Sequence, residues 1–383
     1  MKKWWVAAAA ALVLSGCAPA FEKQEQVVEE DAQQTEKAII PNYQISSDYF
    51  KTLLPYESTD TRGMVVNNLK SRYDIEVFES GLVRMAKEAY STDQYLFKEG
   101  QILDKETIQS WLNRKFTSEQ LKEKGLEEKD NVGLNPVEDT PGEGKDSPIY
   151  LAHVIEHNYL EKFEENKIQL SGVAVGLALN SVSYYQDQST GETRQTTISH
   201  EEVRKQGTEI AQEVINRMRQ NPELDGVPIM IAMYEQSSKG SVTPGSYFAY
   251  ANIPAGSSSI SEWINVDEEH YFFPSDEAEE SYPEDLNIFN EFKEKTETYF
   301  PNYVGVVGSA FYKDGSMQKL EIDIPIQFNG KAETIGFTQY AAELAAELFP
   351  DEMNVEIEIT SGDGAEALIV LSPQKEPFVH IYE

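Results

Sequence analysis

The sequence predicts an α+β fold in which two ββαββ-like repeats follow a mainly helical N-terminal region. Three observations support this prediction. Apolar residues alternate along segments of strand length, long amphipathic helices follow those segments, and the same order of elements recurs about 130 residues later. Each repeat is expected to be an antiparallel sheet with one face covered by its helix.

The chain begins with the pattern of a lipoprotein signal peptide over residues 1–16. Lys2 and Lys3 form a positive end, and residues 4–14 form an apolar run too short to cross a bilayer. The run ends in the sequence LSGC, which predicts cleavage before Cys17 and attachment of diacylglycerol to its thiol. An ordinary secretory signal with a chance cysteine is the alternative. We therefore expect a protein anchored by lipid to the extracytoplasmic face of the cell membrane.

The use of cysteine and charge excludes several classes of protein. Cys17 is the only cysteine, so the mature chain has no disulfide, no Cys-ligated zinc site and no Cys nucleophile. Loss of residues 1–16 removes Lys2 and Lys3 and changes the net charge from −34 to −36. Such an acidic surface is unsuited to nucleic acid. We expect no cofactor and no resident metal.

Two regions precede the repeats. Residues 17–47 are predicted to be a flexible acidic tether, because residues 21–37 are rich in Glu and Gln and offer only two Val and one Phe to bury. Residues 48–148 are predicted to be mainly helical, because Phe78, Leu82 and Met85 follow helical spacing. A stretch rich in Pro and Gly, at 131–148, closes this region.

The first repeat is placed at residues 149–260. It is predicted to contain a strand at 170–185, a return strand at 193–199, a helix at about 200–220, and strands at 227–234 and 246–253. The second repeat is placed at 261–383. Here the turn at Asp314-Gly315 joins strands at 303–312 and 317–328, a helix follows at about 333–349, and further strands lie beyond residue 355.

One motif has the form of a zinc site. His153, Glu156 and His157 form an H-x-x-E-H string, and on a helix both histidines would lie on one face with Glu156 as general base. The alternative is a helix whose apolar residues pack inward, with the histidines at its edge. The motif has no partner ligand marked in the sequence, so zinc peptidase activity is the remote alternative and a protein without enzymatic activity is favoured.

Other patterns concern binding. The sequence has no G-x-S-x-G, Walker A or G-x-G-x-x-G motif. Acidic runs at 267–269 and 277–280 are interpreted as solvated surface, with calcium binding as the alternative. Polar and aromatic residues from both repeats are candidates for a ligand groove. These are Gln236, Ser237, Thr243, Tyr247, Thr334, Gln339 and Tyr340.

Specific strings along the chain resemble a known family. They occur in one order, from residue 49 to residue 382. These strings are YFKTLLP at 49–55, GQILD at 100–104, GLNP at 133–136, GLALNSV at 176–182, QSS at 236–238, TPG at 243–245, AETIGFTQY at 332–340 and VHIY at 379–382. In these strings the chain resembles the CamS family of Gram-positive lipoproteins, the sex-pheromone precursors.

The resemblance implies that the named activity belongs to the signal peptide. In that family a short apolar peptide from the segment before the lipidated cysteine is released and sensed in conjugation. The corresponding segment here is residues 10–16, which is richer in Ala than the known pheromone. The mature protein is expected to be a non-enzymatic surface module. The alternative is a lipoprotein that binds a ligand, a peptide or a cell-wall fragment.

Overall fold

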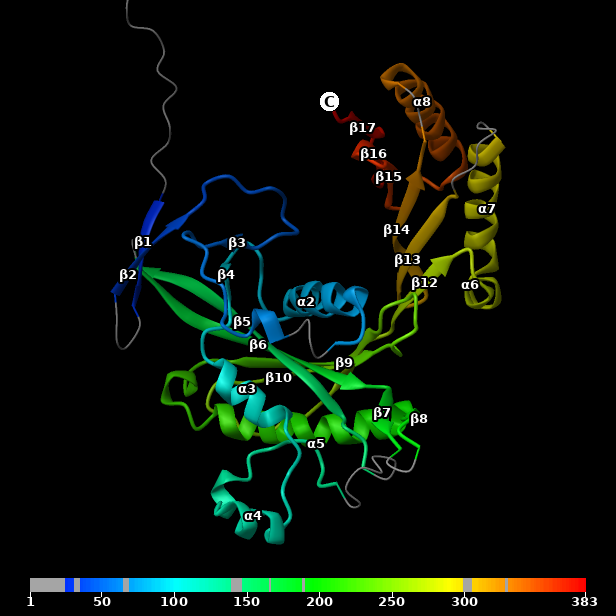
Figure 1. Ribbon diagram of the computed structural model, residues 1–383. Helices are drawn as coiled ribbons and strands as arrows, with labels where there is room; N and C mark the ends of the chain where they lie inside the picture. Colours follow the sequence, from blue (N-terminus) through cyan, green and yellow to red (C-terminus); the bar gives the residue numbers. More distant parts are fainter. Residues whose placement is uncertain are drawn as a thin grey trace, which may run out of the picture.

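The protein consists of two bodies, each with its own β-sheet and hydrophobic core (Figure 1). The computed structural model describes residues 25–30, 35–64, 69–138, 147–164, 167–187, 190–298, 305–327 and 330–383. We call the described residues up to 265 the first body and those from 268 onward the second body. The α+β class is therefore confirmed.

The first body contains a nine-stranded sheet, and its helices lie on both faces of that sheet. In chain order its elements are β1 (Glu25–Glu30), β2 (Thr35–Ile40), β3 (Lys51–Thr52), α2 (Arg72–Ala86), β4 (Tyr95–Glu99), α3 (Lys105–Leu112), α4 (Ser118–Lys124), β5 (Leu151–Glu164), β6 (Lys167–Asn180), β7 (Val182–Gln186), β8 (Thr193–Thr197), α5 (His200–Met218), β9 (Ile229–Gln236), β10 (Ser246–Ile253) and β11 (Ile264–Asn265).

The second body contains a six-stranded sheet with strand order β12-β13-β14-β15-β16-β17. Its elements are β12 (Glu268–Phe273), α6 (Asp276–Ser281), α7 (Pro283–Thr298), β13 (Val307–Lys313), β14 (Ser316–Pro325), α8 (Lys331–Leu348), β15 (Val355–Ser361), β16 (Gly364–Leu371) and β17 (Phe378–Ile381). The helices α6 and α7 fall in a stretch for which no helix was predicted.

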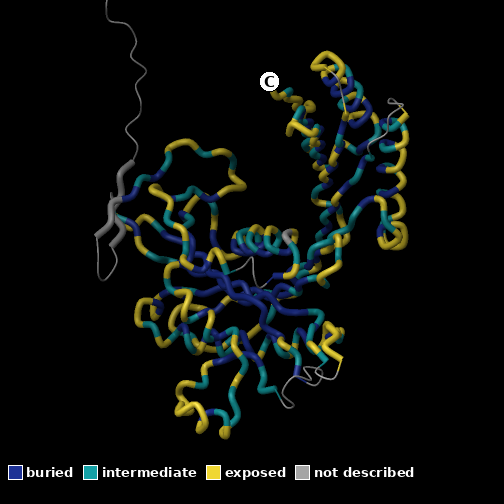
Figure 2. The backbone as a smooth tube through the Cα atoms, viewed as in Figure 1, coloured by how far each residue is buried: buried dark blue, intermediate teal, exposed yellow. Residues whose placement is uncertain are grey.

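Two layers of apolar side chains hold the first body together. Below the sheet, α3 and α5 supply Trp111, Val203 and Val214 to one core. Above it, α2 supplies Phe78, Leu82 and Met85 to a second core. Because both faces are covered, the central strands are buried along most of their length, as the dark blue strands in Figure 2 show. The predicted helix at 200–220 is confirmed as α5.

The second body is covered on one face only. Phe289 of α7 and Phe337 of α8 pack with Ile322 and Ile357 of the sheet, while Lys319 and Glu321 on β14 are exposed or half-exposed. This is the arrangement of a sheet with one dry and one solvated face. The predicted turn at Asp314-Gly315 is confirmed, since both residues have positive φ (53° and 73°) and join β13 to β14.

The prediction of purely antiparallel sheets is wrong. β6 pairs in parallel with β9, and β14 pairs in parallel with β15. In each case a helix, α5 or α8, carries the chain back along the sheet, and such a crossover makes the two strands that it connects parallel. Both sheets have the same core order, which is β5-β6-β9-β10 in the first body and β13-β14-β15-β16 in the second.

The predicted division of the chain also changes. Strands β3 and β4 pair within the same sheet as β5, so residues 48–148 and 149–260 form one body rather than two. The predicted tether at 17–47 is wrong for its described part, because β1 and β2 form a hairpin that joins β6. Ala38 and Ile40 of this hairpin are buried. Residues 17–24, including Cys17, lie outside the described residues, as do residues 1–16.

The helix predicted around residues 151–160 is wrong, because this segment is β5. The strand is almost continuously buried, and it lies in the middle of the nine-stranded sheet between β4 and β6. The polar residues of this segment, His153, Glu156, His157 and Asn158, fall on both faces of the strand, so the sequence shows no two-residue period that would distinguish a strand from a helix. The H-x-x-E-H string therefore lies on a strand.

Candidate functional site

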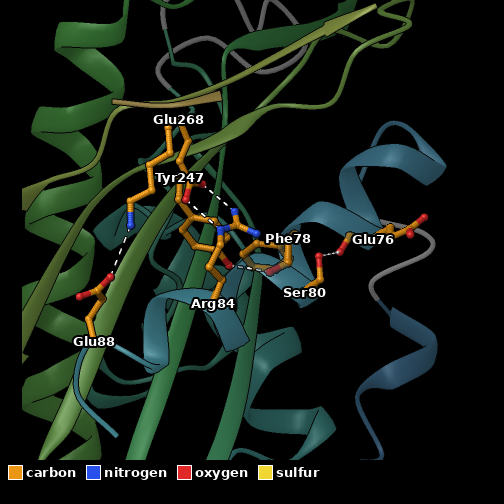
Figure 3. Close-up of polar contacts among 8 residues, drawn as sticks. Glu76, Phe78, Ser80, Arg84, Glu88, Tyr247 and Glu268 are labelled. Atoms are coloured by element: carbon orange, nitrogen blue, oxygen red, sulfur yellow. Dashed lines mark hydrogen bonds and ion pairs between the residues drawn. The ribbon is translucent and has the colours of Figure 1, made fainter. Parts of the chain in front are cut away.

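The two bodies meet at a buried ion pair between Arg84 on α2 and Glu268 on β12 (Figure 3). The Arg84 Nε and Nη2 atoms donate to the two Glu268 oxygens at 2.9 and 2.7 Å. The Glu268 side chain is 0% exposed. The Arg84 guanidinium also lies 4.6 Å from the centre of the Phe311 ring. A planar guanidinium suits both contacts, because it binds a carboxylate with two bonds and stacks on an aromatic ring.

Beside this pair lies a cleft of about 810 Å³, the junction cleft. Its first wall is the β9–β10 connection, residues 237–245, with His200 and Glu235 next to it. Its second wall runs from Asn265 through the beginning of β12 to Glu277 of α6. Residues from both bodies therefore line this cleft.

Some of the acidic side chains in the cleft have a hydrogen-bond or ion-pair partner, and others form no ion pair. Glu235 accepts from the His200 ring at 2.6 Å, and Glu268 is neutralised by Arg84. Glu269 accepts from Tyr282 at 2.8 Å. Within the described chain, neither Asp267 nor Glu277 forms an ion pair. The acidic run at 267–269 is therefore not simply solvated surface, because Glu268 is buried inside it.

Four of the predicted groove residues line the junction cleft, namely Gln236, Ser237, Thr243 and Tyr247. Gln236 is nonetheless buried, donates to Asn180 Oδ1 at 2.6 Å and accepts from the Lys70 amide at 3.0 Å. Tyr247 is 0% exposed and donates its hydroxyl to the Phe78 carbonyl at 2.6 Å. Both side chains thus hold the wall of the cleft rather than face a ligand.

The other three predicted residues lie on α8, in the second body. Thr334 lines a separate hollow of about 360 Å³ with Lys331 and Glu366. Gln339 is exposed, and the Tyr340 hydroxyl donates to the Lys295 carbonyl at 3.3 Å. The structure does not bring these residues to the junction cleft, so the seven candidates do not form a single groove.

The sequence did not reveal the polar centre of the first body, the carboxylate of Asp74. It accepts at 2.7 Å from the hydroxyl of Ser71, the N-cap of α2, and at 2.7 Å from the Tyr234 hydroxyl. It also accepts from the amides of Gly245 at 2.9 Å and Ser237 at 3.2 Å. A carboxylate with several donors is well stabilised when buried. The only local signal was Ser71 three residues before Asp74, a helix-start pattern.

A smaller pocket of about 240 Å³ contains both histidines of the H-x-x-E-H string. Burial lowers the pKa of His153 and of His157 to about 4, so both rings are neutral at pH 7. At the rim, Glu99 accepts from Tyr56 and from the Thr59 amide, and pairs with Arg62 at 3.2 Å. This network fastens residues 56–62 to β4.

The strand geometry of β5 argues against a zinc site at these histidines. Four residues of a strand span roughly 13 Å, which is too far for two ligands of one zinc ion. Glu156 accepts from the amide of Leu103 at 2.7 Å, while His157 contacts Phe97. Burial raises the pKa of Glu156 to about 7. In the described residues, no group of three His, Cys, Asp or Glu side chains is placed to hold a metal ion.

No helix of the described residues combines the length and the apolar character that crossing a membrane requires. Taken together, the fold and the site define a two-body α+β protein whose bodies meet at one buried ion pair beside a polar cleft.

Comparison with known families gives a more specific assignment. The matching family model is described as CamS sex pheromone cAM373 precursor and covers residues 56–377. The chain therefore belongs to the CamS family, which confirms the resemblance seen in the sequence. No curated protein matches the chain.

The solved structures that are similar to this chain include two pheromone precursors. One is the C-terminal domain of the sex pheromone staph-cAM373 precursor from Staphylococcus aureus. It is 35% identical, has a TM-score of 0.72, and the match covers 82% of this chain and 98% of that chain. The other is a sex pheromone precursor from Lactobacillus salivarius subsp. salivarius. It is 29% identical, has a TM-score of 0.80, and the match covers 89% of this chain and 98% of that chain.

Proposed function

We propose that this protein is a surface lipoprotein, anchored to the outer face of the cell membrane through diacylglycerol on Cys17, and the precursor of a short apolar peptide. The observation that carries the proposal is the LSGC sequence at 14–17 in a chain that belongs to a family of pheromone precursors. The peptide comes from residues 10–16, and the mature protein acts without catalysing a reaction. The apolar character of residues 10–16 suits a peptide that leaves the membrane and enters an apolar receptor pocket.

The anchor is tested with Cys17→Ser in the producing cell. Wild-type protein should sediment with membranes and take up labelled fatty acid, whereas the variant should take up none and appear in the medium or keep its signal peptide. Unchanged membrane binding and no label in the wild type would contradict the anchor.

The peptide is tested by mass spectrometry of the culture medium. A peptide that ends at Gly16, found with the wild type and absent with Cys17→Ser, is the expected result. A normally lipidated protein without any such peptide would contradict the precursor role and leave the anchor intact.

For the mature protein, a second proposal is that the junction cleft binds an extended ligand that carries positive charge, such as a basic peptide. Asp267 and Glu277 on the second wall support this, because each is an acid without an ion pair among the described residues. Polar groups of the 237–245 segment supply hydrogen bonds to a main chain.

The probe is a fluorescent lysine-rich peptide, titrated against the full-length protein. Asp267→Asn combined with Glu277→Gln should weaken its binding about ten-fold, since each lost contact of charges costs about 1 kcal/mol or less. Glu343→Gln on the exposed face of α8 is the matched control and should leave binding unchanged. Equal affinities for both variants would show that the peptide binds only to the general acidic surface.

A further inference from the structure

The segment that leaves β2, residues 41–54, exposes apolar side chains to an unusual degree. Tyr43 is 83% exposed and Ile45 is 76% exposed, the two highest values among the large apolar side chains of the described residues. Tyr49, six residues from Tyr43, is 60% exposed. Single exposed apolar residues are common, but three within seven residues form a cluster that requires an explanation. We call residues 41–54 the apical loop.

The apical loop is held in place, so its exposed residues are not an unfinished part of the core. Its base is closed by two hydrogen bonds between Ile39 and Leu54, at 2.8 and 3.0 Å. In the middle, the Thr92 hydroxyl donates to the Ser47 carbonyl at 2.6 Å. Phe50 is buried, with its ring 5.0 Å from that of Tyr159. Some apolar residues of the loop therefore anchor it, while others point outward.

The path of the chain places the loop next to the N-terminal end. Glu25, the first described residue, pairs with Ile40, which directly precedes the loop. Only residues 18–24 separate Cys17 from Glu25. The eight Cα–Cα steps from Cys17 to Glu25 span at most roughly 29 Å. A lipid on Cys17 therefore keeps the base of the loop within that distance of the bilayer, and Figure 1 shows the loop leaving the β1–β2 hairpin, where the described chain begins.

The chemistry of the loop suits a lipid surface. Tyrosine rings prefer the boundary between headgroups and hydrocarbon, and an isoleucine side chain inserts without cost from polar atoms. In a chain with a net charge of −34, residues 41–54 contain one acid, Asp48, and one base, Lys51. This local neutrality removes the repulsion that most of the protein surface would feel near anionic lipids.

We infer that the apical loop is a membrane-contacting surface, and that Tyr43, Ile45 and Tyr49 enter the interfacial layer of the bilayer that carries the Cys17 lipid. The inference rests on the proposed lipid anchor. The apical loop is then a second membrane contact, in addition to the acyl chains on Cys17. The two contacts together orient the first body, with the apical loop toward the membrane and α4 away from it (Figure 1).

The test uses the full-length lipoprotein, purified in detergent and reconstituted into vesicles of phosphatidylcholine and phosphatidylglycerol. Since the lipid consumes the only cysteine, a new cysteine can be labelled alone. Ser47→Cys places an environment-sensitive fluorophore on the loop, and Glu123→Cys places it on α4 as the matched control. We expect the emission at position 47 to shift to shorter wavelength and to be quenched by lipids that carry a quencher, with neither effect at position 123.

The combination Tyr43→Ser, Ile45→Ser and Tyr49→Ser should abolish the shift and the quenching at position 47. Because these side chains are exposed, an unchanged melting temperature verifies the fold. If the wild-type fluorophore stays in water while the protein remains on the vesicles, the inference is overturned and the anchor survives. A shift that depends on protein concentration and is insensitive to the lipid quencher would indicate contact between two copies, and would also overturn it. Protein that never binds vesicles would instead refute the anchor.

Discussion

The two bodies share a strand order but differ in what they bury. The first body buries Asp74, Asn135, Glu156 and Gln236, each within a network of hydrogen bonds. Among the described residues of the second body, the buried polar side chains are Glu268 at the junction and three threonines. Loops of the first body are therefore fixed by specific polar contacts, whereas the second body depends on packing of Phe, Ile and Ala. Such networks define a unique arrangement but are costly to break.

The largest effect is expected at Asp74. Asp74→Ala should lower the stability of the first body by about 3–5 kcal/mol, because the Tyr234 hydroxyl and the amides of Ser237 and Gly245 lose their acceptor. Urea unfolding followed at the two bodies separately measures this. The matched change in the second body is Asp285→Ala, which removes one hydrogen bond from Tyr312. It should cost about 1 kcal/mol, and equal losses would show that the bodies do not differ in this respect.

The junction should respond next. Arg84→Ala leaves the buried Glu268 carboxylate without its partner, which costs about 2–3 kcal/mol and uncouples the unfolding of the two bodies. Calorimetry should then resolve two transitions further apart than in the wild type. The double variant Arg84→Met with Glu268→Gln removes both charges and should recover part of the loss. If it is as unstable as Arg84→Ala, the buried charge is not the cause.

The close packing of α2 predicts that replacing its glycine by alanine lowers the stability, whereas helix propensity alone predicts a rise. Alanine in place of glycine usually stabilises a helix, by about 1 kcal/mol. At Gly81 a Cβ atom would lie 2.6 Å from the Tyr247 ring, so Gly81→Ala should destabilise the first body by about 1–3 kcal/mol. Gly226 has no atom within 4 Å of a Cβ position and serves as the control. Thermal melting of both variants shows whether the contact with the Tyr247 ring causes the loss, because Gly226 lies in a turn where an added methyl group meets no other atom.

The smallest effect concerns pH. The pKa of His157 is lowered to about 4 in the folded protein, against an ordinary value near 6.5. The unfolded chain therefore binds more protons between pH 6.5 and 4, and stability falls as the pH drops through that window. Glu156, with its pKa raised to about 7, acts in the opposite direction, because its favourable protonated state is lost as the pH rises through 7.

His157→Gln should accordingly reduce the fall in melting temperature between pH 7 and pH 5, although its melting temperature at pH 7 is lower than that of the wild type. Exposed His380 in the second body provides the control, since His380→Gln should leave the slope unchanged. Identical slopes for all three proteins would mean that other groups govern the acid sensitivity.

Local patterns predicted the elements whose signals are local. The amphipathic spacing of α5 and α8, and the Asp314-Gly315 turn, were sufficient to place those elements. The strand β5 was predicted as a helix because His153 and His157 have the i, i+4 spacing of a helix face, and a strand buried on both faces shows no alternation of polar and apolar residues. The parallel pairing of β6 with β9 and of β14 with β15 depends on the path of the chain through α5 and α8, which the pattern of a single segment does not show.

The strings that carry the family resemblance mark structural joints more than a binding site. Gly100 is required because a Cβ atom there would lie 2.6 Å from Glu156, and Asn135 bonds to Leu112, Tyr150 and Leu151. Tyr247 was predicted to contact a ligand, yet its ring is buried under α2. Contacts such as that of Asp74 with Gly245 join residues 171 positions apart, and sequence patterns do not reveal them.

The position of Asp74 has a consequence for folding during synthesis on the ribosome. A chain made from its N-terminus presents α2 early, but the donors at Tyr234, Ser237 and Gly245 emerge only after 160 or more further residues. Until then the carboxylate keeps its water, and the apolar face of α2 can pack only against β5 and β6. The first body can therefore close only when most of the polypeptide has appeared, and quality-control proteases have that interval in which to act.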